Sequence, residues 1–120
     1  MSVITVSQGS IESTIQDHAI VILDFWASWC GPCMRFAPVF EASAEQHPDV
    51  VHGKVDTEAE RELAAALRIQ SIPTLMVFKD QTLVFRQAGA LPPAALEELV
   101  QNVKGLNMDE VKAQQAQQQG

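Results

Sequence analysis

Apolar and polar positions in the first part of the chain predict a strand, a helix and then a buried strand. Residues 3–6 alternate as a half-buried strand does, and Ile11 and Ile15 lie at helical spacing within residues 8–17. Residues 20–26 are almost continuously apolar and rich in β-forming side chains, which is typical of a central strand covered on both faces. This segment is the strongest strand prediction in the sequence.

A period of 3.6 residues then predicts a helix that begins near Pro32 and ends before His47 and Pro48. Its apolar positions are Phe36, Val39, Phe40 and Ala44. Pro38 lies inside this helix, and we expect a kink there because proline removes a backbone hydrogen bond and crowds the preceding turn.

Residues 50–55 have the pattern of a further strand, and a second helix should follow them. Thr57 with Glu60 three residues later has the spacing of a capping box, which predicts a helix from Thr57 to about Leu67. Strand, helix and strand therefore alternate through the first half of the chain, as in α/β proteins.

The last part of the folded region predicts a hairpin and a helix. Residues 74–78 and 83–86 are strand-like, and the loop between them has hairpin length, so the two should pair antiparallel. Pro92 and Pro93 open a helix that Gly105 ends. The apolar stripe of that helix consists of Leu96, Leu99, Val100 and Val103.

Composition changes after Gly105 to Asn, Asp, Lys and repeated Ala and Gln, with Met108 and Val111 as the only clear apolar pair. We therefore expect residues 1–105 to form the folded domain and residues 106–120 to be an Ala/Gln-rich tail. A solvated, frayed tail is the expectation, and a short helix capped by Asn107 and Glu110 is the alternative.

Length and charge narrow the class of protein. The chain has 120 residues, the usual size of one domain, with 47% hydrophobic and 19% charged residues as in globular proteins. Eight Lys and Arg against fifteen Asp and Glu give a net charge of -7, which disfavours a nucleic-acid partner because few cations are available to neutralise phosphates. No apolar run approaches the ~20 residues of a membrane span.

Residues 1–10 lack a basic region followed by an apolar run, so we expect a cytoplasmic protein. The cytoplasm keeps thiols reduced, and the only two cysteines, Cys30 and Cys33, are therefore expected to be catalytic or metal-bound rather than a permanent disulfide.

The two cysteines lie between the strongest predicted strand and the helix that follows it, at the N-terminus of that helix. Free N–H groups and the positive end of the helix dipole stabilise an anion there, and the thiolate is the form of cysteine that attacks a disulfide. We assign Cys30, which is nearest the N-terminus of the helix and next to Trp29, as the nucleophile. Cys33, one turn inside, is then the resolving thiol that breaks the mixed disulfide.

A Cys-x-x-Cys pair is also half of a zinc site, which needs three or four ligands. The other half is missing, because His18, His47 and His52 show no ligand pairing with one another. Dithiol chemistry without a metal is therefore the favoured interpretation.

Several separated motifs give the sequence a close resemblance to the thioredoxins over residues 3–103. The motifs are residues 24–27, 29–33, Pro38, 54–56, 71–74, 78–79 and 88–90, with Trp-Cys-Gly-Pro-Cys at 29–33 the most specific. The resemblance implies an α/β thioredoxin fold in which four helices flank a mixed, five-stranded central sheet.

The family also implies roles for residues around the cysteines. Asp24 would be a buried carboxylate of raised pKa that serves as the general base for Cys33. Pro73 would be a cis proline next to the cysteines, leaving the Ile72 backbone free to pair with an extended substrate segment. An exposed apolar surface, which we call the docking rim, would consist of Trp29, Gly31, Pro32, Ile72, Ala88 and Gly89.

Each of these assignments has a structural alternative. Asp24 could face solvent or a backbone N–H at the end of its strand, and Pro73 could be a trans proline that opens a strand. The rim residues could be plain packing, above all Ala88.

Two positions depart from the family pattern. Met34 stands where the family often has a cation, although Arg35 follows it. His52 stands where many members have a lysine near the buried carboxylate, which could make proton transfer more sensitive to pH. A solvated histidine is the simpler interpretation, and the one that we expect.

The resemblance implies a protein-disulfide reductase that is recycled by an NADPH-dependent thioredoxin reductase and needs no bound cofactor. Implied clients are ribonucleotide reductase, peroxiredoxins and methionine sulfoxide reductases, and we expect a monomer. An oxidase or isomerase would be favoured by an export signal or a polar residue at Pro32. A non-enzymatic binding module would not need Cys30 and Cys33.

Overall fold

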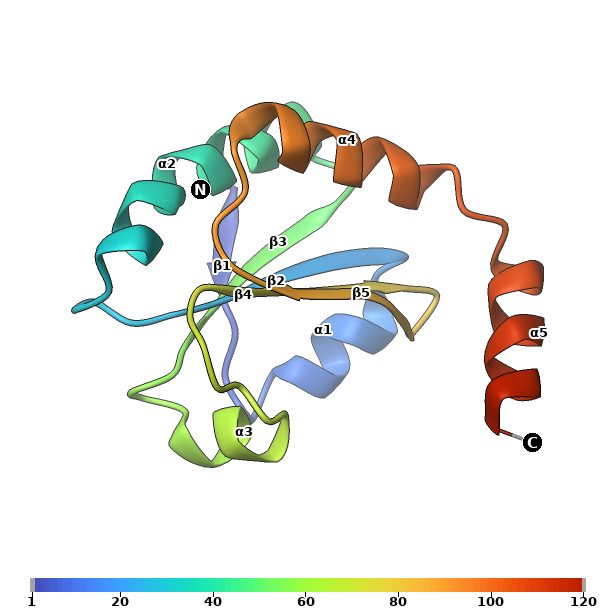
Figure 1. The fold of residues 1–120 in the computed structure, drawn as a ribbon, viewed down its shortest axis with the longest axis horizontal. Helices are drawn as coiled ribbons and strands as arrows, with labels where there is room; N and C mark the ends of the chain where they lie inside the picture. Colours follow the sequence, from blue (N-terminus) through green and yellow to red (C-terminus); the bar gives the residue numbers. More distant parts are fainter. Residues whose placement is uncertain (1, 120) are drawn as a thin grey trace.

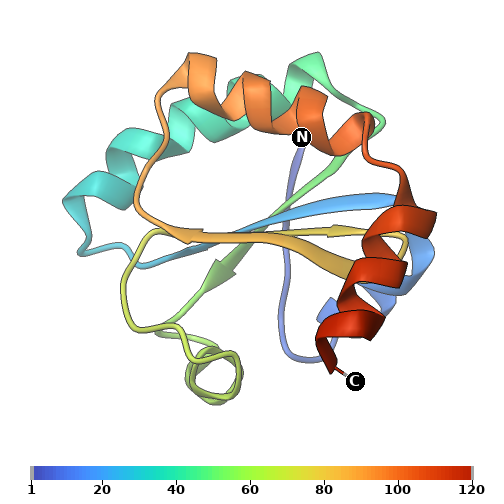
Figure 2. The same ribbon diagram turned by 45° about the vertical axis from the view of Figure 1, so that its right-hand side comes forward.

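The computed structural model describes residues 2–119 and shows one five-stranded sheet with helices on both faces (Figure 1). The elements in chain order are β1 (Val3–Thr5), α1 (Ile11–Asp17), β2 (Ile20–Trp26), α2 (Gly31–Gln46), β3 (Val51–Asp56), α3 (Arg61–Ala66), β4 (Thr74–Lys79), β5 (Thr82–Ala88), α4 (Pro93–Lys104) and α5 (Met108–Gln119). Helices α2 and α4 cover one face, and α1 and α3 cover the other (Figure 2).

The sheet is mixed, with strand order β1-β3-β2-β4-β5. Strand β3 pairs parallel with both β1 and β2, whereas β4 pairs antiparallel with β2 and β5. The predicted fold class and five-stranded mixed sheet are confirmed. The structure has one helix more than the four that the resemblance implies, because α5 follows α4.

Strand β2 lies in the middle of the sheet because both of its faces are covered by helices. Ile22 packs in a core with Phe36 of α2 and Leu96 of α4, whereas its neighbours Val21 and Leu23 pack in a second core on the α1 and α3 side. Burial of each such side chain contributes about 1.5–3 kcal/mol. Two-sided burial explains why this strand is continuously apolar, and it gives the segment that leads to Cys30 a rigid base.

The predicted capping box at Thr57 is wrong, because α3 begins at Arg61. The Asp56 side chain accepts hydrogen bonds from the backbone N–H groups of Glu58 and Ala59, at 2.9 and 3.4 Å. The Thr57 hydroxyl donates to the Trp26 carbonyl at 3.0 Å instead of accepting from a helix N–H group, as a cap would. A turn held by Asp56 therefore occupies the residues where we expected the first turn of the helix.

Of the two states considered for residues 106–120, the structure has the helix, α5. The Asn107 side chain accepts from the Glu110 N–H at 3.3 Å, as expected for a helix start, and Met108 is buried. The Gln115 side chain donates to the Leu83 carbonyl of β5 at 3.1 Å, which holds α5 near the outer strand of the sheet. The division into a domain of residues 1–105 and a tail stays a prediction.

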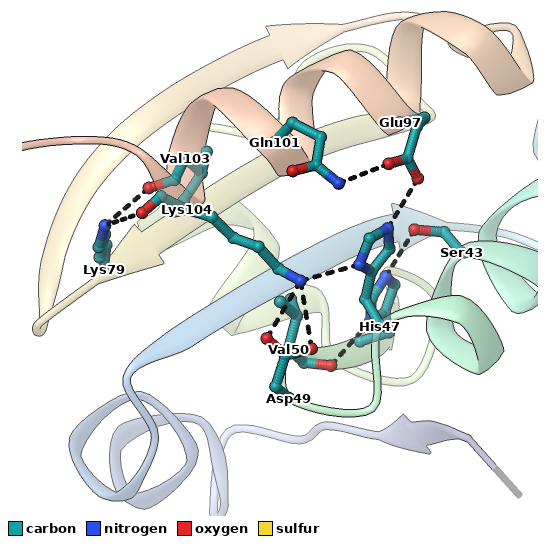
Figure 3. A network of polar contacts seen from close by, with 10 residues as sticks. Ser43, His47, Asp49, Val50, Lys79, Glu97, Gln101, Val103 and Lys104 are labelled. Atoms are coloured by element: carbon teal, nitrogen blue, oxygen red, sulfur yellow. Dashed lines mark hydrogen bonds and ion pairs between the residues drawn. The ribbon is translucent and has the colours of Figure 1, made fainter.

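A polar network joins the C-terminal end of α2 to α4 (Figure 3). The ring of His47 lies between two side chains of α4, with Nε2 2.7 Å from Glu97 Oε1 and Nδ1 2.9 Å from Lys104 Nζ. Lys104 Nζ also lies 3.1 Å from Asp49 Oδ2. This network fixes the two helices together about 24 Å, the length of α2, from the end where the cysteines lie.

Candidate active site

A disulfide joins Cys30 and Cys33 at the junction of β2 and α2. Cys30 is the N-cap of α2, and its sulfur accepts a hydrogen bond from the Cys33 N–H at 3.2 Å. Because a sulfur at this position satisfies one of the free N–H groups of the first turn, the local backbone favours an anionic sulfur. Both cysteines are nearly enclosed, with 4% of Cys30 and 1% of Cys33 exposed.

Two segments from later in the chain meet beside Cys30, at residues 72–73 and 88–89. The Ile72–Pro73 peptide bond is cis, as the resemblance implies, and the Ile72 carbonyl oxygen lies 3.8 Å from Cys30 Sγ. The Pro73 carbonyl accepts a hydrogen bond from the Gly89 N–H at 2.7 Å. Gly89 has a φ of 106°, a left-handed conformation that glycine adopts without strain. The predicted residues at 72–73 and 88–89 are thus brought together beside the disulfide.

The docking rim is largely exposed. Trp29 has 69% of its surface exposed, Gly31, Pro32, Ala88 and Gly89 are exposed, and Ile72 is half-buried. A contiguous exposed apolar patch, unlike a single exposed apolar side chain, often marks a binding surface. Met34, at 48% exposure, extends the apolar surface on the α2 side.

Asp24 of β2 is fully buried, and within residues 2–119 neither carboxylate oxygen has a hydrogen-bond partner. Burial raises the pKa of Asp24 to about 7, against a smaller opposing effect of the Lys54 charge. Lys54 is paired with Asp24 in the β2–β3 register, and its Nζ lies 4.4 Å from the centre of the Trp26 ring. A carboxyl group with this pKa can hold or accept a proton near neutral pH.

His52 is not the solvated residue that we expected, since none of its surface is exposed. Its Nδ1 lies 3.0 Å from the Val50 carbonyl, and its Nε2 lies 2.9 Å from the Ser43 hydroxyl of α2. A carbonyl only accepts, so Nδ1 carries the hydrogen and Nε2 accepts from Ser43 in a neutral ring. Burial lowers the pKa of His52, which agrees with this assignment. The prediction was wrong because α2 covers the middle of β3.

Lys54 is the residue near the site to which the sequence analysis gave no role. The charge that acts on Asp24 comes from Lys54 and not from position 52, where the family comparison led us to look. The sequence predicted both strands but not their pairing, which sets Asp24 opposite Lys54, just as Trp26 lies opposite Asp56.

Two negative findings apply to residues 2–119. No group of three or more His, Cys, Asp or Glu side chains in this part of the chain lies close enough together to hold a metal ion. Nor does any helix among these residues have the length and apolar character needed to cross a membrane.

Comparisons with known proteins agree with this geometry. The thioredoxin family model matches residues 2–104. A putative thioredoxin 2 from Streptomyces coelicolor is 50% identical over 118 residues, which are 98% of this chain and 88% of that protein. Thioredoxin from Bacillus subtilis is 42% identical over 84 residues, 69% of this chain and 81% of that one.

Solved structures give the same result. A mutant thioredoxin from Halobacterium salinarum superposes with a TM-score of 0.81 at 33% identity, and the match covers 88% of this chain and 93% of that one. A thioredoxin from Plasmodium falciparum gives a TM-score of 0.76 at 36% identity, covering 82% and 96%. With its Cys30–Cys33 pair in the matched region, the chain belongs to the thioredoxin family of oxidoreductases that act on disulfides.

Proposed function

We propose that this protein reduces disulfides of client proteins, with Cys30 as the nucleophile and Cys33 as the resolving thiol. The observation that carries the proposal is the position of the Cys30–Cys33 pair at the N-terminus of α2, with Cys30 Sγ beside the Ile72 carbonyl. An anionic sulfur is favoured there, and a backbone segment able to bind a client lies next to it.

The reaction has two exchange steps. The Cys30 thiolate attacks one sulfur of the client disulfide; that S–S bond breaks, and the departing client sulfur takes a proton from water. Cys33 then loses its proton and attacks Cys30 Sγ, which breaks the mixed disulfide and releases the second client sulfur, and that sulfur also takes a proton from water. The client gains two electrons and two protons, and the protein ends with the Cys30–Cys33 disulfide that the structure contains.

Asp24 is the proposed acceptor of the Cys33 proton. Its support is a raised pKa of about 7 and the absence of a hydrogen-bond partner for either oxygen within residues 2–119, which leaves the carboxylate free to take a proton. A carboxylate of ordinary pKa would bind a proton too weakly near neutral pH to deprotonate a thiol.

The docking rim and the Ile72 backbone are the proposed client-binding surface. An extended client segment that pairs with a backbone makes hydrogen bonds that do not depend on its side chains. The docking rim, with Trp29 as its most exposed large side chain, would bury apolar surface of the client. This contribution also depends little on the client's sequence. A surface of this kind suits a reductase that acts on many different proteins.

Recycling by an NADPH-dependent thioredoxin reductase belongs to the same proposal, and no bound cofactor is required. A thioredoxin-like structure at 26% identity and a TM-score of 0.77, covering 84% of this chain and 95% of that one, comes from work on thiol resolution in a yeast mitochondrial 1-Cys peroxiredoxin. That likeness supports peroxiredoxins as clients here. Ribonucleotide reductase and methionine sulfoxide reductases as clients, the cytoplasmic location and the monomeric state stay predictions.

A turnover assay with NADPH, a bacterial thioredoxin reductase and insulin tests the proposal. We expect NADPH consumption that depends on this protein and is abolished in Cys30→Ser. In Cys33→Ser, we expect mixed disulfides between Cys30 and clients to accumulate, because the thiol that resolves them is absent.

The double variant Cys30→Ser/Cys33→Ser is the matched control, and it should trap nothing. A pure binding module would give no cysteine-dependent NADPH consumption. Adducts recovered on Cys33 of the Cys30→Ser variant, with none on Cys30 of Cys33→Ser, would reverse the assignment of the two sulfurs.

A further inference from the structure

A groove of about 270 Å³ opens beside the disulfide, between the first turns of α2 and the segment that joins β5 to α4. Its lining is mostly apolar and includes Pro32, Val39, Leu91 and Pro92, together with one charged residue, Arg35. Figures 1 and 2 both show the β5–α4 segment passing alongside α2. Neither the docking rim nor the exchange steps account for this groove.

Arg35 brings a positive charge to the edge of the active-site turn. A Cβ atom built on Gly31 would lie 3.3 Å from Nη1 of Arg35, so the guanidinium group extends back over the turn that holds the cysteines. Arg35 is exposed, and within residues 2–119 it makes no side-chain hydrogen bond and no ion pair. Its five N–H donors are therefore available to a binding partner.

The groove is continuous with the docking rim. Gly89, whose N–H binds the Pro73 carbonyl, is followed directly by Ala90, Leu91 and Pro92 of the groove. Pro32 belongs to both surfaces. When a client segment lies along the docking rim beside Cys30, a side chain next to the reacting client cysteine can therefore reach the groove.

The charges around the groove favour an anionic group. Among the residues that the structure describes, the first turns of α2 and α4 contain no acidic side chain that would repel a carboxylate. The net charge of -7 acts at long range, but salt screens exposed charges beyond about 8 Å at physiological ionic strength. A client bound in the groove is therefore affected more by the nearby positive charge of Arg35 than by the net charge of the chain.

We propose that this groove is a specificity subsite for client disulfides that have an apolar residue and an acidic residue next to the reacting cysteine. The apolar side chain packs against Val39, Leu91 and Pro92, and the carboxylate pairs with the Arg35 guanidinium, which suits two-point binding of a carboxylate. This inference rests on the proposed function, since it concerns the client of the same disulfide exchange.

Peptides of defined sequence test the subsite. Each peptide carries one cysteine in a mixed disulfide with a neutral 2-pyridylthio group and, on one side of that cysteine, the pair Leu-Glu or Leu-Gln. Two further peptides have the pair on the other side. The rate of pyridine-2-thione release is measured with excess reduced protein, at low and at high salt.

For the parent protein, we expect a Glu peptide to react about two to five times faster than its Gln partner in at least one arrangement, the range of an exposed ion pair. High salt should bring the ratio of the Glu-peptide rate to the Gln-peptide rate closer to one. In Arg35→Gln, the ratio should fall to about one, and Arg35→Lys should keep part of it. The matched control Arg61→Gln, an exposed arginine on α3, should keep the parent ratio.

A Glu-to-Gln ratio of one in the parent protein for both arrangements would overturn the subsite. So would Arg35→Gln if it slowed both peptides equally and kept the ratio, because Arg35 would then act on the protein's own sulfur. If the parent released no more thione than Cys30→Ser from any peptide, the disulfide exchange itself would be refuted, a result distinct from a missing preference.

Discussion

Asp24 on β2 and His52 on β3 are both completely buried and titratable, but they differ in whether their polar atoms have hydrogen-bond partners. Both ring nitrogens of His52 have partners, Ser43 and Val50, whereas neither oxygen of Asp24 has one within residues 2–119. A buried polar atom without a partner costs about 1–3 kcal/mol, so folding alone favours the His52 arrangement. The cost accepted at Asp24 falls on the strand that leads to the redox pair, and we propose that this carboxylate accepts the Cys33 proton.

The same difference separates the two ends of α2. At its C-terminal end, His47 is held between Glu97 and Lys104, and both of its ring nitrogens have polar partners (Figure 3). At its N-terminal end, the side chains of Trp29 and Arg35 are exposed, and the sulfur of Cys30 caps the helix. One end joins α2 to α4, and we propose that the other end binds clients and reacts with them.

Asp24→Asn should produce the largest effects. The folded protein binds the Asp24 proton more tightly than the unfolded chain does, because the pKa rises from 3.8 to about 7 on folding. Stability therefore falls as the pH rises through this interval. Relative to the parent, the Asn variant should gain about 4 kcal/mol of unfolding free energy between about pH 4 and pH 8, measured by urea titration.

The same variant should release clients from the mixed disulfide about a hundredfold more slowly, because Cys33 loses its general base. Single-turnover kinetics with insulin across the pH range would show this loss. An unchanged pH–rate profile would contradict the catalytic role of Asp24, whatever the change in stability.

His52→Leu should cost about 3 kcal/mol of unfolding free energy at neutral pH, because Ser43 and the Val50 carbonyl are left unpaired in the core. The pKa of His52 is lowered by burial, so the parent loses stability as the pH falls below about 6.5, and the variant should not. The cost of the substitution should therefore be smaller at acid pH.

Removal of the Ser43 hydroxyl gives a control for this prediction. Ser43→Ala combined with His52→Leu should be less destabilised than the sum of the single variants, since the orphaned hydroxyl is gone. Strict additivity would show that the hydrogen bond between them is unimportant.

Lys79→Met should cost about 2 kcal/mol without a change in turnover. Lys79 Nζ donates to the carbonyls of Val103, Lys104 and Leu106, at 2.8, 3.0 and 3.1 Å, and so neutralises the C-terminal end of α4. Thermal and urea unfolding would measure the loss. Lys112→Met removes an exposed lysine of α5 and should leave stability nearly unchanged; equal losses in the two variants would contradict the capping role.

Glu97→Gln should have the smallest effect. Hydrogen bonds from His47 and then Gln101 lower the pKa of Glu97. A carboxylate with a lowered pKa stabilises the fold at neutral pH, and that contribution disappears as the pH falls through its folded value. The variant should therefore be slightly less stable than the parent at pH 7 and equal to it in acid; a difference that persisted in acid would point to packing instead.

The parts of the fold that sequence predicted are those in which one local pattern agrees with the packing. Residues 20–26 are apolar at every position but one, and the hairpin of β4 and β5 has both strands and a short loop between them. The cysteine pair was equally clear, because its chemistry and its place before a helix are both local. Such features need no knowledge of distant segments.

The failures all depend on segments that meet only in the folded chain. His52 and Lys54 lie on the same face of β3, but α2 covers His52 and leaves Lys54 half-buried, a difference invisible in the strand itself. Thr57 has the spacing of a cap, yet its hydroxyl donates a hydrogen bond to the carbonyl of Trp26 in β2. The groove at Arg35 needs residues more than fifty positions away to complete it.

The hydrogen bond between Gln115 and the Leu83 carbonyl affects how readily this protein aggregates at high concentration. Strand β5 ends the sheet, and the unpaired backbone of an outer strand can template a strand from another molecule, the first step of edge-to-edge aggregation. At the opposite edge, β1 is only three residues long. A chain cut before residue 108 would uncover the Leu83 carbonyl and lengthen the free edge of β5, and it should aggregate more readily than the intact protein.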